Sequence, residues 1–214
     1  KPEQLQDLNA RVAACTACRL AQGRTQTVPG DGDPNAELMF IGEAPGFNED
    51  RQGHPFVGQA GRLLDQLLGE IGLTRADVFV TNEVKCRPPN NRDPEADEMT
   101  ACEPFLTEQI QGIRPKLIVT LGRFAMQRFL PGAAISRVHG KPVNAAGRLI
   151  YPVYHPAAAL RQGALMQVLR EDFRRIPDLL AAAERPPPRP DASGGAGAGQ
   201  DAAGQGDATQ LPLL

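Results

Sequence analysis

The sequence has no long apolar run and no strong excess of charge of either sign. Of its 214 residues, 41% are hydrophobic and 22% are charged, and 23 Lys and Arg stand against 25 Asp and Glu. No apolar stretch is long enough to cross a bilayer, so no membrane role is expected. Residues 1–14 are polar and lack the apolar segment and cleavage site of a secretory signal. We therefore expect a cytoplasmic protein.

Two common signatures of nucleotide-handling enzymes are also missing. The chain contains neither the lysine of a P-loop nor a G-x-G-x-x-G turn. The sequence therefore does not favour a phosphate- or nucleotide-handling hydrolase.

Large apolar residues become scarce at the C-terminal end. From Arg185 onward the composition shifts to Pro, Gly, Ala, Gln and Asp, with almost no large apolar side chain before Leu211. Such a segment cannot bury enough surface to offset the entropy cost of ordering it. We expect one domain over residues 1–184 and a disordered tail over residues 185–214, whose partner the sequence does not identify.

Within the core, short apolar runs alternate with amphipathic stretches. The runs are brief and continuous, as in strands that are covered on both faces. They occupy residues 38–41, 78–80, 117–119 and 149–153, and the helical patterns lie at 60–71, 94–113 and 123–130. This alternation predicts an α/β fold of three layers, α/β/α, with a central, mainly parallel four-stranded sheet. In such sheets the ligand site forms beyond the carboxyl ends of the strands.

The near-neutral total charge conceals an uneven distribution. Residues 1–122 hold 12 basic and 18 acidic residues, a net charge of −6, whereas residues 123–176 hold nine basic and two acidic residues, a net charge of +7. We expect the second half of the core to face phosphate, although each arginine alone could equally decorate a solvated helix face.

The loops after the strands carry the side chains that could take part in binding or catalysis. The first strand runs into a turn of two glycines and a proline around Glu43, which brings backbone N–H groups close to a ligand. Alone, such a turn indicates a phosphate site or a simple change of direction. Asn82 ends the second strand and His155 follows the fourth, so both could face the same pocket as Glu43.

Four separated motifs, in order, resemble a known family. They are Gly42-Glu43-Ala44-Pro45-Gly46 with Glu49-Asp50, then Phe56, then Asn82 before Cys-Arg-Pro-Pro, then His155-Pro156-Ala157-Ala158. Together with four cysteines, they resemble family 4 of the uracil-DNA glycosylases, the iron-sulfur type of bacteria and archaea, over about residues 1–180. The water-activating aspartate of other families is absent, and Glu43 stands in that loop.

The resemblance implies a base-excision repair enzyme that flips uracil out of single- or double-stranded DNA and hydrolyses its glycosidic bond. The extruded base must be held in a closed pocket, read on its Watson-Crick edge and stacked on an aromatic face. Phe56 can supply the face beside Gly42. The amide of Asn82 matches O4 and N3–H of uracil and mismatches cytosine. His155 is our choice of donor to uracil O2.

Two residues are candidates to activate the attacking water. Glu43 is the only acid inside the first tight turn, and Asn91 could orient the same water through its side-chain oxygen. We favour Glu43 slightly, because Asn90-Asn91 could also be an ordinary polar turn.

DNA contacts are expected in the basic half. In the family resembled, the loop after the His-Pro motif is similar to a minor-groove wedge, which here places Leu160 as the apolar plug and Arg161 against phosphate or a base edge. The loop at residues 136–141, with Arg137, is either a second contact to the DNA backbone or a plain surface hairpin.

The cysteines are few and fully accounted for as one set. Cys15 and Cys18 form a C-x-x-C, and Cys86 and Cys102 follow much later. In a cytoplasmic protein four thiolates suit a metal better than a disulfide framework. Spacing alone leaves zinc slightly ahead of an iron-sulfur cluster. The resemblance implies a 4Fe-4S cluster with a structural role.

One alternative function remains open. A non-catalytic nucleic-acid-binding module with a structural four-cysteine metal site would explain the cysteines and the charge asymmetry. It would leave Glu43, Phe56, Asn82 and His155 as coincidence. We expect the protein to be a monomer.

Overall fold

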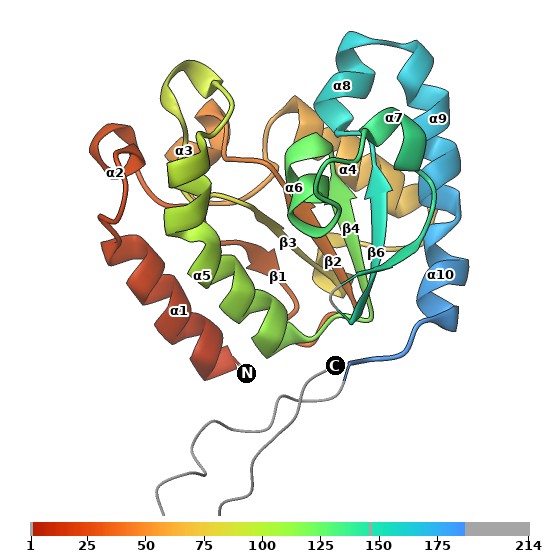
Figure 1. Ribbon diagram of the computed structural model, residues 1–214, viewed down its shortest axis with the longest axis horizontal. Helices are drawn as coiled ribbons and strands as arrows, with labels where there is room; N and C mark the ends of the chain where they lie inside the picture. Colours follow the sequence, from red (N-terminus) through yellow and green to blue (C-terminus); the bar gives the residue numbers. More distant parts are fainter. Residues whose placement is uncertain (1, 146, 187–214) are drawn as a thin grey trace, which may run out of the picture.

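A computed structural model describes residues 2–145 and 147–186 (Figure 1). The expected tail at 185–214 lies almost entirely outside the described residues. No helix in the described part is long and apolar enough to cross a membrane.

A six-stranded sheet forms the centre of the fold. Its order is β1-β3-β2-β4-β6-β5, and the four inner strands are parallel while β1 and β5 are antiparallel edges. The strands are β1 (Asp31–Gly32), β2 (Leu38–Gly42), β3 (Val78–Asn82), β4 (Leu117–Leu121), β5 (Val143–Ala145) and β6 (Arg148–Val153). Every residue of β2, β3 and β4 is buried, as parallel strands covered on both faces require.

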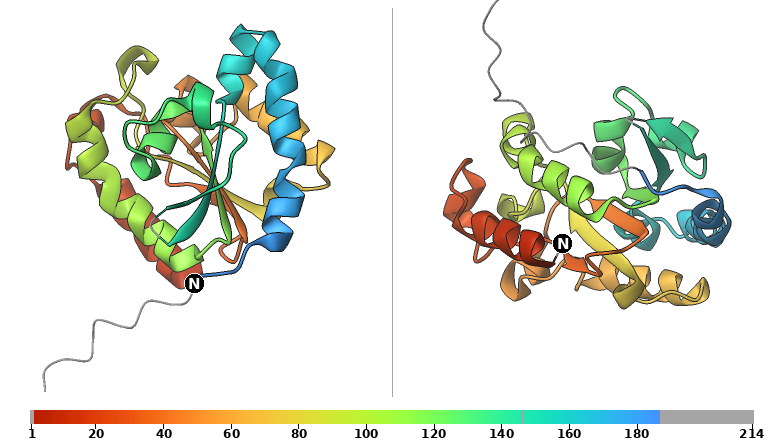
Figure 2. Two further views of the ribbon diagram at one scale, coloured as in Figure 1. Left: turned by 45° about the vertical axis from the view of Figure 1, so that its right-hand side comes forward. Right: turned by 90° about the horizontal axis from the view of Figure 1, so that it is seen from below.

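Helices cover both faces of the sheet, which gives three layers (Figures 1 and 2). The longer helices are α1 (Pro2–Ala14), α4 (Gln59–Glu70), α5 (Ala96–Ile113), α6 (Arg123–Phe129), α9 (Ala164–Arg174) and α10 (Ile176–Ala182). The shorter elements are α2 (Leu20–Gly23), α3 (Phe47–Gln52), α7 (Ile135–Val138), α8 (Pro156–Arg161) and the 3-10 turns at Arg75–Asp77 and Pro89–Asn91.

Alternation along β2 divides the core between the two faces. Leu38 and Phe40 pack with the leucines of α4 and with residues of α9, whereas Met39 and Ile41 pack with α5 and α6. Side chains of successive strand residues point to opposite faces, so one strand serves two cores. Both faces of the sheet are thus covered, and the loops that follow the strands extend from its carboxyl end.

The predicted fold class is confirmed, and the strand count is larger than expected. All four predicted strands form the parallel centre in the structure. The two extra strands have two and three residues, so they carry too little alternation to be recognised as strands in the sequence. The segment at 136–141, considered as a hairpin, instead contains the end of the short helix α7.

Candidate functional site

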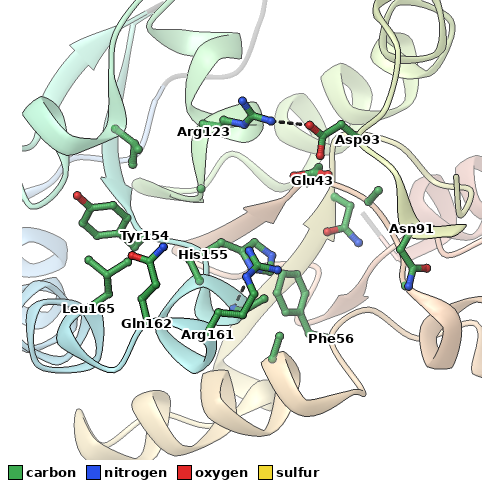
Figure 3. A pocket seen from close by; sticks show the side chains of 18 of the residues that line it. Glu43, Phe56, Asn91, Asp93, Arg123, Tyr154, His155, Arg161, Gln162 and Leu165 are labelled. Carbon is green, nitrogen blue, oxygen red and sulfur yellow. Dashed lines mark hydrogen bonds and ion pairs between the residues drawn. The ribbon is translucent and has the colours of Figure 1, made fainter.

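A cavity of about 580 Å³ opens beyond the carboxyl ends of the parallel strands (Figure 3). Its walls include the residues that end or follow three strands, namely Glu43 after β2, Asn82 at the end of β3 and His155 after β6. The parallel sheet therefore brings together three of the side chains predicted from separate motifs, at the edge where such sheets bind ligands.

Asn82 presents an unpaired oxygen within the walls of this cavity. The residue is 1% exposed, and its Oδ1 has no hydrogen-bond partner among the described residues. A buried acceptor without a donor is costly in a folded protein. The missing donor is therefore a natural role for a ligand.

Gly42 lies directly beside Asn82 in the β2–β3 pair. A Cβ at this position would lie 2.4 Å from Asn82 Oδ1 and 2.6 Å from Cζ of Phe56. Glycine is needed here because any side chain would collide with both residues, not because of an unusual backbone conformation.

Phe56 is held in an uncommon backbone conformation. Its φ of 55° lies in the left-handed region, and its carbonyl oxygen accepts a hydrogen bond of 2.7 Å from Nη2 of Arg75. The ring lies 5.6 Å from the imidazole of His155, with 28° between the planes. A Cβ on Gly61 would lie 1.7 Å from the Phe56 carbonyl oxygen, so α4 approaches this turn closely.

Glu49 connects the first loop to the Phe56 turn. One carboxylate oxygen accepts 2.9 Å hydrogen bonds from the backbone N–H groups of Val57 and Gly58, and the other accepts a 3.1 Å bond from Gly46. Glu49 belongs to a motif noted in the sequence, but its positioning role depends on contacts between separated segments. Arg75 is a second such residue that sequence reasoning missed.

His155 caps the start of α8 and is neutral. Its Nδ1 accepts a 3.0 Å hydrogen bond from the backbone N–H of Ala157. Burial, together with the nearby charge of Arg161, lowers the pKa of His155 to about 4. A neutral imidazole that accepts at Nδ1 carries its proton on Nε2. This residue is therefore a hydrogen-bond donor to the cavity near neutral pH.

Glu43 lies in the cavity wall with a perturbed carboxyl group. Burial and the nearby Asp93 raise the pKa of Glu43 to about 7, while Arg123 and Arg161 act in the opposite direction. Asp93 and Arg123 form an ion pair across the cavity rim (Figure 3). These two rim residues were not singled out as site residues from the sequence, because nothing in their local pattern indicates that they meet.

Asn91 lies on the rim, on the opposite side of the cavity from Gln162 and Leu165 (Figure 3). It has a φ of 53°, and its Oδ1 accepts a 2.7 Å hydrogen bond from Nε of Arg87. The oxygen that was predicted to orient water is thus already engaged by a guanidinium in this structure.

The predicted DNA-contacting residues occupy exposed positions. Leu160 is 46% exposed near the end of α8, and the exposed Arg161 also lines the cavity. Arg137 is exposed in α7 and is not among the residues lining the cavity. His139 from the same segment is engaged elsewhere, because its Nδ1 lies 2.8 Å from Asp172 and its ring lies against Tyr154.

The four cysteines line one small second cavity, between the N-terminal segment and the start of α5. All four are free, and three of their sulfurs receive backbone or guanidinium N–H groups: Cys15 from Ala17 at 3.5 Å, Cys86 from Arg24 at 3.2 Å and Cys102 from Lys85 at 3.2 Å. In the described part of the chain, no three His, Cys, Asp or Glu side chains are arranged to hold a single metal ion.

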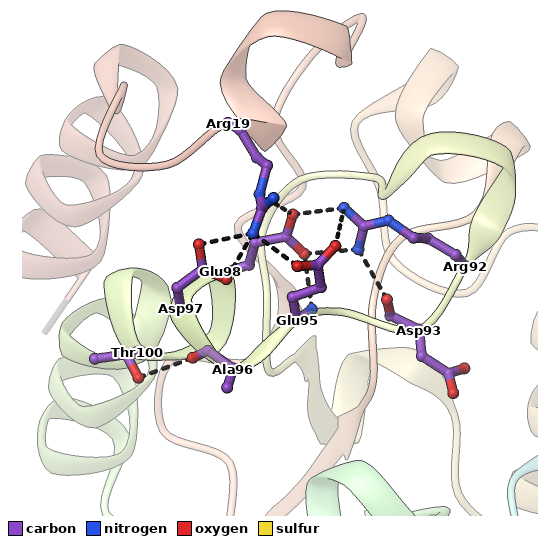
Figure 4. Close-up of polar contacts among 8 residues, drawn as sticks. All are labelled: Arg19, Arg92, Asp93, Glu95, Ala96, Asp97, Glu98 and Thr100. Atoms are coloured by element: carbon purple, nitrogen blue, oxygen red, sulfur yellow. Dashed lines mark hydrogen bonds and ion pairs between the residues drawn. The ribbon is translucent and has the colours of Figure 1, made fainter.

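An ion-pair network reinforces the same junction (Figure 4). The buried carboxylate of Glu98, in the first turn of α5, accepts hydrogen bonds of 2.8 and 2.6 Å from Arg92 and lies 3.2 Å from Nε of Arg19. Arg19 also contacts Glu95 and Asp97. These contacts join the cysteine-bearing N-terminal segment to the loop that carries Asn91.

The chain is similar to known proteins over most of its length. A model of the Uracil DNA glycosylase superfamily matches residues 29–175. A type-4 uracil-DNA glycosylase of Sulfurisphaera tokodaii is 49% identical over 193 residues, covering 86% of this chain and 88% of the relative. A type-4 uracil-DNA glycosylase of Saccharolobus solfataricus is 51% identical, covering 80% and 84%, and one of Archaeoglobus fulgidus is 45% identical, covering 83% and 94%.

Proposed function

The chain belongs to the uracil-DNA glycosylase superfamily, and we propose that it excises uracil from DNA in base-excision repair. The reaction hydrolyses the N-glycosidic bond of a uracil flipped into the cavity beyond β2, β3 and β6. Its products are free uracil and an abasic site.

The unpaired Oδ1 of Asn82 is the observation that carries this proposal. Uracil brings an N3–H donor to that acceptor, and its O4 can accept from the amide nitrogen of the same side chain. Cytosine presents the opposite pattern at both positions. The buried oxygen gains its missing partner from uracil and stays unpaired with cytosine, which penalises the wrong base.

Phe56 and Gly42 shape the part of the cavity that takes the base. The ring of Phe56 provides an aromatic surface for stacking, as enzymes that act on extruded bases require. Because Gly42 has no side chain, Asn82 and Phe56 can both lie against it in the cavity wall.

His155 stabilises the leaving uracil. As the glycosidic bond breaks, negative charge develops on the base and positive character on the sugar. The Nε2–H of the neutral imidazole donates to uracil O2, where that negative charge gathers. A donor fixed in place before the reaction needs no reorganisation when the charge appears.

Glu43 activates the water that attacks the sugar. A carboxyl group with a pKa of about 7 is about half ionised near neutral pH, and so can accept the proton of water as the bond to the sugar forms. Asn91 assists from the rim if the Arg87 contact rearranges. The anionic form of Glu43 also lies near the developing sugar cation.

The DNA strand is held around the cavity mouth by residues from the basic half. Leu160 fills the gap left by the extruded base, and Arg161 contacts the adjacent phosphate or a base edge. Arg137 contacts the backbone further from the cavity. We propose that residues 1–184 form the glycosylase domain, and the expected cytoplasmic monomer stays a prediction.

We propose that Cys15, Cys18, Cys86 and Cys102 hold a 4Fe-4S cluster. Four free thiols line one cavity, and N–H groups donate to three of the sulfurs, which is the kind of hydrogen bond that tunes an iron-sulfur cluster. The cluster would crosslink the N-terminal segment to α5 and transfer no electrons in hydrolysis.

A product assay tests the function. Purified protein is incubated with oligonucleotides that differ only in carrying uracil, thymine or cytosine at one position, and free bases are separated by chromatography. We expect free uracil and an alkali-labile abasic site from the uracil substrate alone. Binding to all three oligonucleotides without base release would favour the non-catalytic module instead. Broad visible absorption from sulfur-to-iron charge transfer should accompany activity, and stoichiometric zinc without iron would defeat the cluster assignment.

A further inference from the structure

Phe47 is an exposed aromatic side chain beside the uracil cavity. It is the first residue of α3, 50% of it is exposed, and the preceding Gly46 lines the cavity. In the described part of the chain, only Leu160 is a comparably exposed large apolar residue. Single exposed apolar residues are ordinary on protein surfaces, so the neighbours of Phe47 decide its significance.

Two guanidinium groups lie against the Phe47 ring. The Cζ atoms of Arg51 and Arg87 lie 5.6 and 5.1 Å from the ring centroid. We call Phe47, Arg51 and Arg87 together the Phe47 edge. It combines an aromatic face with planar cations, the two kinds of surface on which nucleic-acid bases stack.

The two arginines of the Phe47 edge are free to form an ion pair with a ligand. Within the part of the chain that the structure describes, neither Arg51 nor Arg87 has a carboxylate at ion-pair distance, and Arg87 contacts only the neutral amide of Asn91 besides the ring. The nearby acids of α3, Glu49 and Asp50, form no ion pair with these arginines, and their carboxylates accept hydrogen bonds from backbone N–H groups instead. By contrast, Arg123 on the same cavity rim is paired with Asp93.

The Phe47 edge lies on the opposite side of the cavity from α8. The 2.7 Å hydrogen bond between Arg87 and Asn91 joins it to the rim, and Asn91 lies across the cavity from Gln162 and Leu165 (Figure 3). A strand that enters along α8 and places one nucleotide in the cavity must leave past the opposite rim.

We propose that the Phe47 edge binds the uracil-containing DNA strand on the side of the cavity opposite α8. A base flanking the extruded uracil stacks on Phe47, and Arg51 and Arg87 contact the neighbouring phosphates. Stacking of this kind tolerates any base sequence, as a repair enzyme requires. In duplex DNA the flanking base stays paired, so the contribution is largest on single-stranded DNA. The assignment rests on the proposed function, because it takes the flipped uracil as the fixed point of the strand.

Phe47→Ala tests the stacking. We expect kcat/KM for uracil release from a single-stranded oligonucleotide to fall about tenfold, mainly through KM, with a smaller effect on the same sequence as duplex. Phe47→Trp should restore activity. Both variants change an exposed side chain, and equal melting temperatures will establish that they fold.

The restoring variant also provides a direct signal, because the chain contains no tryptophan. The fluorescence of Phe47→Trp should be quenched when a base stacks on the indole. The probe is a single-stranded oligonucleotide with one 2′-fluoro-2′-deoxyuridine, whose electron-withdrawing fluorine slows bond cleavage. Gln6→Trp, at an exposed site on α1, is the control that should not be quenched.

Arg51→Ala tests the phosphate contact. The slope of log affinity against log salt concentration should become shallower by about 0.7, the change expected when a single strand releases one phosphate from the protein. Lys116→Ala is the control, because it removes the same charge just before the amino end of β4, far from the carboxyl ends of the strands where the cavity lies. It should leave the slope unchanged.

The outcomes separate the two proposals. If wild-type protein releases uracil while Phe47→Ala is unimpaired and Phe47→Trp is not quenched, the Phe47 edge does not bind the strand and the glycosylase function stands. If Phe47→Trp is quenched but the wild type releases no uracil, the edge is a strand-binding surface and the proposed function fails.

Discussion

The pH dependence of uracil release reports directly on Glu43. With a pKa of about 7, this carboxyl group is about nine-tenths ionised at pH 8, half ionised at pH 7 and one-tenth ionised at pH 6. A general base acts only when ionised, so the rate constant of the chemical step should fall with falling pH, approaching tenfold per unit below pH 6. His155 does not add a second transition, because its pKa of about 4 keeps it neutral over this range.

The sign of the effect follows from the causes of the shift. Burial and Asp93 disfavour the anion of Glu43, whereas Arg123 favours it. Arg123→Ala removes that stabilising charge and also frees Asp93 from its ion pair, so both changes should move the transition to higher pH.

Single-turnover release of uracil from a single-stranded oligonucleotide, measured from pH 5 to pH 9 at constant ionic strength, is the appropriate assay. Glu43→Gln keeps the size of the side chain and cannot accept the proton, so its rate should be lower by about 10²- to 10⁴-fold and independent of pH between 6 and 8. A wild-type rate that is flat over this interval, or a Glu43→Gln variant with the wild-type profile, would refute the assignment of Glu43 as the base.

Two further substitutions test how the site is built. Gly42→Ala places a methyl group against Asn82 Oδ1, so uracil release should fall at least about tenfold while overpacking lowers stability by about 1–3 kcal/mol, as measured by product assay and denaturant unfolding. Glu98→Gln removes a carboxylate whose pKa is lowered by hydrogen bonds from Arg92. In denaturant unfolding at pH 7, this variant should have a free energy of unfolding about 1–3 kcal/mol lower than wild type. The lowered pKa stabilises the fold only where the carboxylate is ionised. The difference in unfolding free energy between variant and wild type should therefore persist above the ordinary glutamate pKa of about 4.3 and vanish as the pH falls through the pKa of the folded state. A difference that is constant down to pH 2 would contradict this.

The sequence was most informative about the sheet and the residues at its carboxyl edge. The inner strands are short, continuous and apolar, and parallel strands must place their following loops on one side. Glu43, Asn82 and His155 could therefore be assigned to one pocket before any contact was known, and the structure brings them together.

The supporting contacts could not be read from local patterns. Glu49 accepts a hydrogen bond from the turn beside Phe56, and Arg75 donates one to the Phe56 carbonyl. Both bonds join segments that are apart in the sequence and meet only through packing. Asn91 was recognised as polar and close to the site, but its contact with Arg87 was not. The two edge strands were not predicted, because strands of two or three residues are too short to show a periodic pattern in the sequence.

The central claim is that Asn82 reads the uracil edge inside this cavity. Asn82→Asp keeps the shape of the side chain and, while ionised, can only accept hydrogen bonds, so it repels uracil O4. Each buried partner left unsatisfied costs about 1–3 kcal/mol, which is roughly one to two orders of magnitude in rate. The deciding measurement is the single-turnover rate of free uracil release by Asn82→Asp, compared with that of wild type. Equal melting temperatures of the two proteins will show that the variant is folded. The account predicts a decrease of at least about tenfold, and an unchanged rate would contradict it.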